Sequence, residues 1–190
     1  MSEKSSPANE AALVCAARQG DKGSLQALLA RHWLWLKGLI YSILRDSEAT
    51  EDALQDVCVL VLNKIGGLRE PERFRPWLAR LARNVALSQR AQQSRRPGPL
   101  GEDTPAAAGP SVSDVLDRQE QSRRILEGVH ALPDKYGEVF VMKYVQELSY
   151  GEIAEILDIP VTTVQIRLVR ARRMIYNRLT GLPNNKVPRT

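Results

Sequence analysis

Apolar residues recur every three or four positions along most of this 190-residue chain, which is the spacing that places them on one side of an α-helix. Apolar and polar residues do not alternate as they do in strands, and aromatic residues make up only 5% of the sequence. The pattern therefore predicts an all-α protein.

The first half of the chain is expected to hold four helices. Helical spacing begins near Glu10, resumes over about 24–44 with Asp21 as a cap, and continues from a turn at 45–47 to about residue 65. A fourth helix begins near Phe74. The residues expected to face inward are Leu25, Leu28, Leu29, His32, Trp33, Leu36, Ile40 and Ile43, then Leu54, Val57, Cys58, Val61, Leu62 and Ile65, then Phe74, Trp77, Leu78, Leu81 and Val85.

The composition changes after the fourth helix. Residues 94–113 are mainly Ser, Arg, Pro, Gly, Ala and Thr, with almost nothing to bury, and helical spacing returns from about 115 to 179. We therefore expect two small helical domains, an N-terminal helical bundle and a C-terminal helix-turn-helix domain, joined by a flexible linker. The expected boundaries are a flexible arm at 1–9, domains at 10–92 and 119–180, a linker at 93–118 and a flexible tail at 181–190.

The last part of the second domain has the pattern of a helix-turn-helix. Ser149 and Glu152 stand at capping-box spacing, and Pro160 suits the first turn of a following helix. That helix should bury Val164, Leu168, Ala171 and Ile175, and expose Ile166, Val169, Arg170 and Arg173. Guanidinium groups beside exposed apolar side chains suit phosphate, guanine and thymine-methyl contacts in the major groove of DNA. A helical hairpin with a basic solvated side is the alternative.

Charge and composition narrow the function classes. The formal net charge of +5 favours an acidic partner, and a hydrophobic content of 43% is enough for a folded core. Cys15 and Cys58 have no metal-ligand or redox spacing, and we expect no metal and no cofactor. No segment resembles a secretion signal or a membrane span, so we expect a cytoplasmic protein without membrane contact of its own.

The outer face of the third helix is acidic and has an apolar centre. The face consists of Glu51, Asp52, Gln55, Asp56 and Asn63, with Val59 in its middle. We call Glu51, Asp52, Gln55, Asp56 and Val59 the acidic stripe. Such a face indicates either a docking surface for a protein or an ordinary solvated face, and the residues alone favour the solvated face.

The outer side of the fourth helix is basic. It carries Arg80, Arg83 and Arg90 with Asn84 on its flank, and Arg73, Arg75, Arg95 and Arg96 lie nearby. Tracking a nucleic-acid backbone is its simplest use, and the aromatic Phe74 next to Arg73 can help to hold an unstacked base. A solvated basic face is the alternative.

Three motifs in this order carry a family resemblance. Residues 50–57 (TEDALQDV) look like a polymerase-binding helix, residues 74–84 (FRPWLARLARN) like a promoter-melting segment, and Leu132-Pro133 with the helix-turn-helix like a C-terminal DNA-binding domain. Together they resemble the extracytoplasmic-function (ECF) group of bacterial RNA polymerase sigma factors, over about 10–92 and 119–180.

The resemblance implies an alternative sigma factor that binds core RNA polymerase, directs it to specific promoters and promotes promoter melting. The acidic stripe (Glu51, Asp52, Gln55, Asp56 and Val59) would then dock on the clamp helices of the large polymerase subunit, which replaces the solvated-face interpretation. Single-stranded DNA of the minus-ten element would be held by Arg73, Phe74, Trp77, Arg80, Arg83, Asn84 and Arg90. The minus-thirty-five duplex would be read by Thr162, Thr163, Gln165, Ile166, Val169, Arg170 and Arg173. Besides core RNA polymerase and promoter DNA, an anti-sigma factor wedged between the domains is a candidate partner.

The chain departs from the family pattern at several positions. Gln165-Ile166 stands where a basic-Ser pair is frequent, so the upstream sequence preference does not transfer. Asp158 stands where Gly is frequent in the turn, although Asp tolerates left-handed backbone better than most residues. Ser88 and Ala91 also depart, so contacts at the end of the fourth helix do not transfer.

Two other function classes compete with this interpretation. A stand-alone helix-turn-helix repressor or response-regulator output domain would explain the C-terminal half, but neither the acidic stripe nor the 77–84 segment. An enzyme would need a catalytic site, and the sequence has no paired-carboxylate, Ser-His-Asp, phosphate-loop or metal pattern, while His32 and His130 have no partners nearby in sequence. We therefore expect no catalytic residue.

Overall fold

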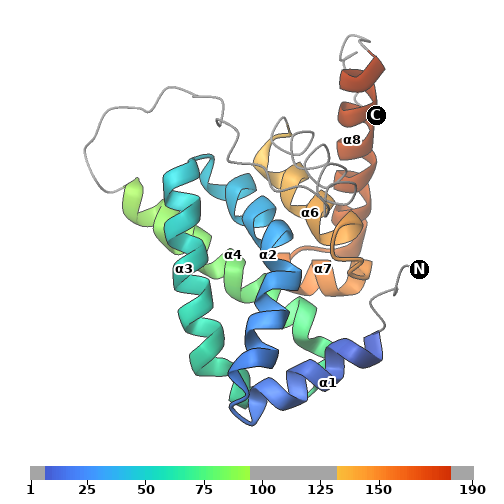
Figure 1. Ribbon diagram of the computed structural model, residues 1–190. Helices are drawn as coiled ribbons and strands as arrows, with labels where there is room; N and C mark the ends of the chain where they lie inside the picture. Colours follow the sequence, from blue (N-terminus) through green and yellow to red (C-terminus); the bar gives the residue numbers. More distant parts are fainter. Residues whose placement is uncertain (1–6, 95–131, 181–190) are drawn as a thin grey trace. The chain divides into compact units, whose positions relative to one another are not determined.

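The computed structural model describes residues 7–94 and 132–180, and every regular element in these two ranges is a helix. The chain divides into two compact units, Met1–Pro110 and Ser111–Thr190, whose helices are drawn in Figure 1. The predicted all-α fold with two small helical domains is confirmed. Most of the predicted arm and linker, and the whole predicted tail, lie outside the described residues.

The N-terminal unit is built around one long helix. Its helices are α1 (Pro7–Arg18), α2 (Lys22–Leu44), α3 (Ser47–Lys64) and α4 (Phe74–Gln93), with two short 3₁₀ turns, η1 (Ile65–Gly67) and η2 (Pro71–Arg73), between α3 and α4. α2 contacts α1, α3 and α4, and α3 also contacts α4 (Figure 1). α1 begins three residues before the expected start near Glu10, because proline suits the first turn of a helix.

Local capping decides where these helices begin and end. Asp21 accepts backbone hydrogen bonds at 3.2 and 3.0 Å from the first turn of α2, and Asp46 accepts one at 2.8 Å from the first turn of α3. Arg45 ends α2 in the left-handed conformation with a φ of 58°. The predicted cap at Asp21 and the predicted turn at 45–47 are therefore confirmed.

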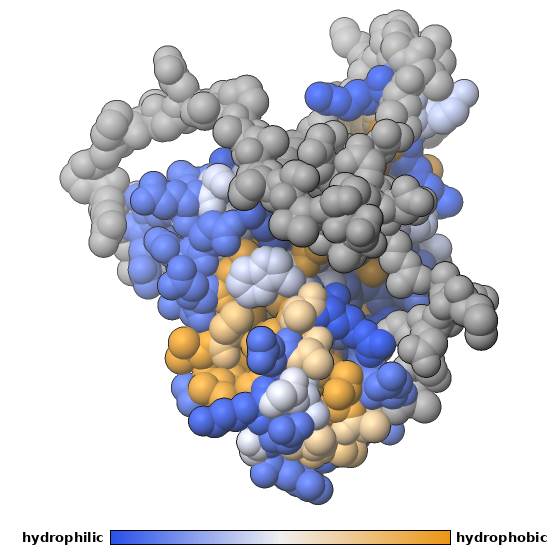
Figure 2. Space-filling model, viewed as in Figure 1, coloured by the Kyte–Doolittle hydropathy of each residue, from blue (hydrophilic) through white to orange (hydrophobic). Residues whose placement is uncertain are grey.

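The inner faces of α2 and α3 differ from the prediction at particular positions. Trp33, expected inside, is 38% exposed, whereas Trp35 and Leu39 are buried. Three helices contact α2, so its buried surface is wider than the single stripe that we expected. Leu62 of α3 is 57% exposed, because it points away from the buried line that runs through Val61. Figure 2 shows apolar side chains reaching the surface of this unit.

In α4 the buried line is made largely of small residues. It runs through Phe74, Leu78, Ala79, Ala82 and Ala86. Phe74 and Leu78 are buried as expected, and beyond them the alanines let α4 approach α2 and α3 closely, so other large residues flank the contact. The expected inner residues Trp77, Leu81 and Val85 are consequently only half buried.

The C-terminal unit places one helix against two others. α8 (Val161–Thr180) contacts both α6 (Asp134–Tyr144) and α7 (Tyr150–Leu157). As predicted, Val164, Leu168 and Ala171 of α8 are buried, while Ile175 is half buried. Leu132, Tyr136 and Ala171 form one cluster of the core, against which Phe140, Met174 and Ile175 pack.

Candidate functional site

The solvent-facing side of α8 is cationic and has an apolar centre. Its outer face consists of six exposed residues, which are Thr162, Gln165, Ile166, Val169, Arg170 and Arg173. Ile166 and Val169 are 52% and 57% exposed, so neither side chain is used to fill the core. α8 contains no acidic residue. The predicted division of this helix into an inner and an outer side is confirmed.

The turn before α8 holds the outer face in place. The backbone N–H of Ser149 donates to the Glu152 carboxylate at 2.8 Å and the N–H of Glu152 donates to the Ser149 hydroxyl at 3.2 Å, which completes the predicted capping box of α7. Asp158 ends α7 with a φ of 53°. The carbonyl of Pro160 then accepts from the N–H groups of Thr163 and Val164 at 2.9 and 3.2 Å. Thr163, the remaining predicted contact residue, is half buried in the first turn of α8.

Other cations of this unit have structural partners. The guanidinium of Arg172 on α8 lies 6.0 Å from the ring centroid of Tyr144 on α6. Lys143 Nζ lies 4.9 Å from the Tyr150 ring and donates to the Leu148 carbonyl at 3.0 Å. These cation–π contacts join α6 to α8 and α7. Arg172 therefore has a different environment from Arg170 and Arg173.

The basic side of α4 forms a second candidate surface on the other unit. Arg80, Asn84 and Arg90 are exposed along α4, and Arg73 is exposed at the end of η2. Trp77 and Arg83 are half buried beside them. A row of guanidinium groups over several helical turns can follow a phosphate backbone, and the half-buried indole offers part of an aromatic surface to a base.

Phe74 is not part of this surface, and its predicted role in DNA contact is corrected. Its side chain is fully buried, with ring centroids 5.4 Å from His32 and 5.8 Å from Trp77. An aromatic residue next to arginine at a helix start suggested an exposed ring. The first residue of α4 instead turns inward because α2 lies directly beneath it.

A buried ionic network lies close to Phe74, and sequence reasoning did not find it. The Glu10 carboxylate on α1 accepts from Arg75 Nε at 2.8 Å and Nη2 at 3.2 Å, and it lies 3.2 Å from His32 Nε2 and 3.7 Å from Arg31 Nη1. Trp35 Nε1 donates to His32 Nδ1 at 2.8 Å, which leaves the proton of a neutral imidazole on the nitrogen facing Glu10.

The network changes the role of Arg75 and the ionisation of Glu10. Burial by itself raises the pKa of Glu10, but hydrogen bonds from His32 and Arg75 and the positive charge of Arg75 outweigh it and lower the pKa from 4.5 to about 2. Arg75, which by sequence belongs with the basic residues near α4, therefore links α4 to α1 through its hydrogen bonds to Glu10. No sequence signal marks a pair of residues 65 positions apart.

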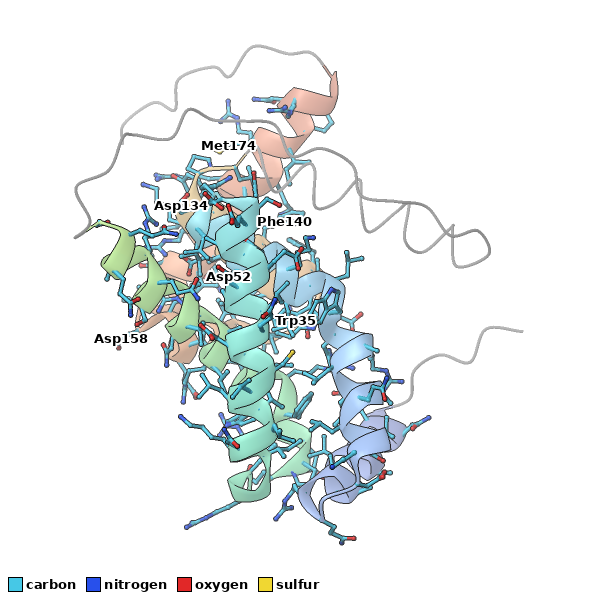
Figure 3. The ribbon with its side chains drawn as sticks, turned by 60° about the vertical axis from the view of Figure 1, so that its left-hand side comes forward. Trp35, Asp52, Asp134, Phe140, Asp158 and Met174 are labelled. Carbon is cyan, nitrogen blue, oxygen red and sulfur yellow. The ribbon has the colours of Figure 1, made fainter. Side chains whose placement is uncertain are left out.

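The acidic stripe lies on the outer side of α3, with Asp52 labelled on that helix in Figure 3. Asp52, Gln55, Asp56 and Val59 are exposed, and Val59 is 57% exposed. Glu51 is half buried and pairs with Lys37 of α2. The Asp56 carboxylate accepts from Gln89 of α4 at 2.9 Å. The stripe is thus oriented by both neighbouring helices while its apolar centre stays accessible.

The side chains in the described ranges form no group of three or more that could hold a metal ion. Burial raises the pKa of the Cys58 thiol, which keeps it protonated and unreactive at neutral pH. In the part of the chain that the structure describes, no helix is both long and apolar enough to cross a membrane. The described residues thus form three candidate binding surfaces. Two are basic, the outer face of α8 and the basic side of α4, and the third is the acidic stripe on α3.

Family models match both units of the chain. Residues 28–96 match the model described as Sigma-70 region 2, and residues 122–175 match Sigma-70, region 4. The first of these contains the acidic stripe and the basic side of α4, and the second contains the outer face of α8.

Curated proteins are similar over nearly the whole chain. The ECF RNA polymerase sigma-E factor of Haemophilus influenzae is 32% identical over 181 residues, which cover 90% of this chain and 95% of that protein. The ECF RNA polymerase sigma factor SigW of Bacillus subtilis is 29% identical over 175 residues, covering 87% and 94%.

Two solved structures share the fold. CnrH in complex with the cytosolic domain of CnrY has a TM-score of 0.59 and 22% identity, covering 90% of this chain and 97% of that one. The sigma factor RpoE in complex with the anti-sigma factor NepR from Bartonella quintana has a TM-score of 0.63 and 22% identity, covering 84% and 97%.

Proposed function

This chain belongs to the extracytoplasmic-function group of RNA polymerase sigma factors, and we propose that its two units hold two separate elements of one promoter while it is bound to core RNA polymerase. Sigma factors direct core polymerase to promoters and promote melting. The observation that carries the proposal is the order of a region 2 unit and a region 4 unit in one chain. We place the first unit at 10–92, a linker at 93–118 and the second unit at 119–180, with an arm and a tail outside them.

The acidic stripe is our proposed polymerase contact. Val59 supplies an accessible apolar centre, and Asp52 and Gln55 supply exposed polar groups around it. An apolar centre with a polar rim is the usual anatomy of a protein interface. Glu51 and Asp56 are held by Lys37 and Gln89, so the interface is partly ordered before binding.

The basic side of α4 is our proposed contact to single-stranded DNA of the minus-ten element. Arg73, Arg80, Arg83 and Arg90 would follow the backbone, while Trp77 and Asn84 would hold an unstacked base. Binding energy captured on the single strand would drive melting. Nucleotide addition would stay with the polymerase, so the chain itself would have no catalytic residue.

The outer face of α8, together with Thr163, is our proposed contact to the minus-thirty-five duplex. Its six exposed residues and its lack of acidic residues suit entry into the major groove. The role at the polymerase places the protein in the cytoplasm. Because CnrH and RpoE were solved with CnrY and with the anti-sigma factor NepR, an anti-sigma factor is a further proposed partner.

Run-off transcription tests the proposal as a whole. Purified chain and core polymerase are incubated with a promoter library, and we expect transcripts that start at specific promoters only when the chain is present. If the chain binds duplex DNA by itself but yields no promoter-specific transcripts, it is a repressor of the helix-turn-helix class and the proposal fails.

Asn84→Ala should slow open-complex formation by about ten- to hundredfold, which corresponds to losing about 1–3 kcal/mol of contact to one base. Affinity for core polymerase should not change, because Asn84 is exposed on α4 and outside the acidic stripe. Potassium permanganate reactivity of promoter thymines measures the open complex, and a fluorescence titration measures core affinity. Ser88→Ala, one turn further along, is the matched control; equal loss of both properties in Asn84→Ala would indicate misfolding instead.

Arg170→Ala should weaken binding to the upstream element by about 1–3 kcal/mol and relax preference at one base pair. The measurement is competition between duplex variants for holoenzyme. Arg178→Ala, exposed at the far end of α8, serves as the control for loss of charge alone. Unchanged upstream preference in Arg170→Ala would show that a different side of α8 reads the DNA.

A further inference from the structure

Two apolar side chains at the centre of the outer face of α8 have no role in folding. Ile166 and Val169 are more than half exposed, while the buried side of the same helix is completed by Val164, Leu168 and Ala171. Isoleucine and valine are also weaker helix formers than the alanine, lysine or arginine that an exposed helical position favours. The residues therefore cost stability at these positions unless something covers them.

The surroundings of this pair indicate what covers it. Gln165, Arg170 and Arg173 are exposed next to Ile166 and Val169, and α8 has no acidic residue that would repel a phosphate backbone. Gln and Arg side chains can pair in a bidentate manner with adenine and guanine, respectively, in the major groove. The apolar group that the major groove offers beside such edges is the C5-methyl of thymine.

We propose that Ile166 and Val169 bind the C5-methyl groups of two thymines in the upstream promoter element, so that this chain requires thymine there and not merely an A·T-like shape. The inference deepens the proposed function, on which it rests, by naming a chemical feature of its DNA site. Ile166, together with Gln165, stands where the family frequently has a basic-Ser pair, so the family preference does not transfer at that position.

The spacing of the two residues predicts where the thymines lie. Three residues along an α-helix span about 4.5 Å at 1.5 Å per residue. Successive base pairs of duplex DNA are about 3.4 Å apart. One helix lying in the groove therefore sets the two side chains against neighbouring base pairs, and we expect the methyl requirement at two adjacent positions.

Replacing thymine by deoxyuridine tests the proposal, because the change removes only the methyl group. Holoenzyme made from the full chain and core polymerase first selects a sequence from duplexes with a randomised upstream element. Each thymine of the selected sequence is then replaced singly by deoxyuridine, and affinity is measured by competition. We expect a loss of about three- to fivefold at each of two neighbouring positions, as for one buried methyl group, and no loss elsewhere.

Alanine substitutions at the two proposed contact residues show which residue contacts which thymine methyl group. Ile166→Ala and Val169→Ala should each bind the thymine duplex about three- to fivefold more weakly and become insensitive to deoxyuridine at one of the two positions. The thermal unfolding temperature should stay the same or rise slightly, because the removed atoms are exposed and alanine favours helix more than isoleucine or valine does. Arg170→Ala should lose affinity but keep its sensitivity to deoxyuridine at both positions.

Two outcomes would overturn the inference. Equal binding of thymine and deoxyuridine duplexes by the wild type would show that the methyl groups are not read. Unchanged duplex affinity in Ile166→Ala and Val169→Ala would assign this apolar pair to a protein partner. In both cases the holoenzyme would still yield promoter-specific run-off transcripts, whereas failure of the proposed function would abolish those transcripts.

Discussion

Phe74→Ala should lower the free energy of unfolding of the N-terminal unit by about 3–5 kcal/mol, the usual cost of deleting a buried aromatic ring. The ring is fully buried and lies against His32 and Trp77. Its removal leaves a cavity between α2 and α4, at the start of the helix that carries the proposed minus-ten contacts. Transcription by the holoenzyme should therefore fall because the unit unfolds, and not because a DNA contact is lost.

Tryptophan fluorescence is a suitable measurement for this variant. All three tryptophans, Trp33, Trp35 and Trp77, belong to the N-terminal unit, so urea unfolding followed at their emission reports that unit. Phe74→Leu is the control, and by keeping most of the volume it should cost only about 1 kcal/mol. If Phe74→Ala unfolds like the wild type yet cannot form open complexes, Phe74 contacts DNA after all.

Glu10→Gln should lower the stability of the same unit by about 3 kcal/mol at neutral pH. The lowering of the Glu10 pKa from 4.5 to about 2 means that folding favours the ionised carboxylate by an amount of this order. Glutamine keeps the size of the side chain but not its charge. Arg75, Arg31 and His32 would then lose the carboxylate that they surround.

The same shift predicts how stability depends on pH. Because the pKa is lower in the folded state, the contribution of Glu10 is fully present above the unfolded pKa of about 4.5 and is lost as the pH falls toward 2. The unfolding free energies of wild type and Glu10→Gln should therefore converge over this range. Urea unfolding at a series of pH values, again followed by tryptophan emission, measures the difference.

Glu48→Gln is the matched control for this prediction. Glu48 is exposed in the first turn of α3, and its replacement should change stability by less than about 0.5 kcal/mol at any pH in the series. A constant difference between Glu10→Gln and wild type from neutral to acid pH would show that the carboxylate is not stabilised in its ionised form.

The helices and their ends could be predicted because the signals that set them are local. Asp21, the turn at 45–47, the Ser149–Glu152 box and the turn at Pro160 act within a few residues of one another, so their effect can be read from neighbouring positions. The two-sided pattern of α8 was equally readable, since one helix buries one stripe and exposes the other.

The predictions of buried residues were wrong at positions where several helices pack together. Trp33 and Leu62 were expected inside and are exposed, because the direction of the buried side depends on which helices pack against it. In α4 the expected burial of Phe74 and Leu78 is confirmed, but alanines fill the rest of the buried line and Trp77 flanks it. The spacing of apolar residues identifies which side of a helix is apolar. It does not predict how wide the buried side becomes, because that width depends on how many helices pack against it.

By itself, then, the sequence determined the helical class, the helix ends that local caps and turns set, the two-unit order and the cationic outer face of α8. Each of these depends on residues within a few turns of one another. Only the tertiary structure decided that Phe74 faces the core and that Arg75 is held by Glu10, because both facts depend on α1 and α2 lying beside the start of α4. Contacts between residues 65 positions apart arise from chain packing, and no local pattern encodes them.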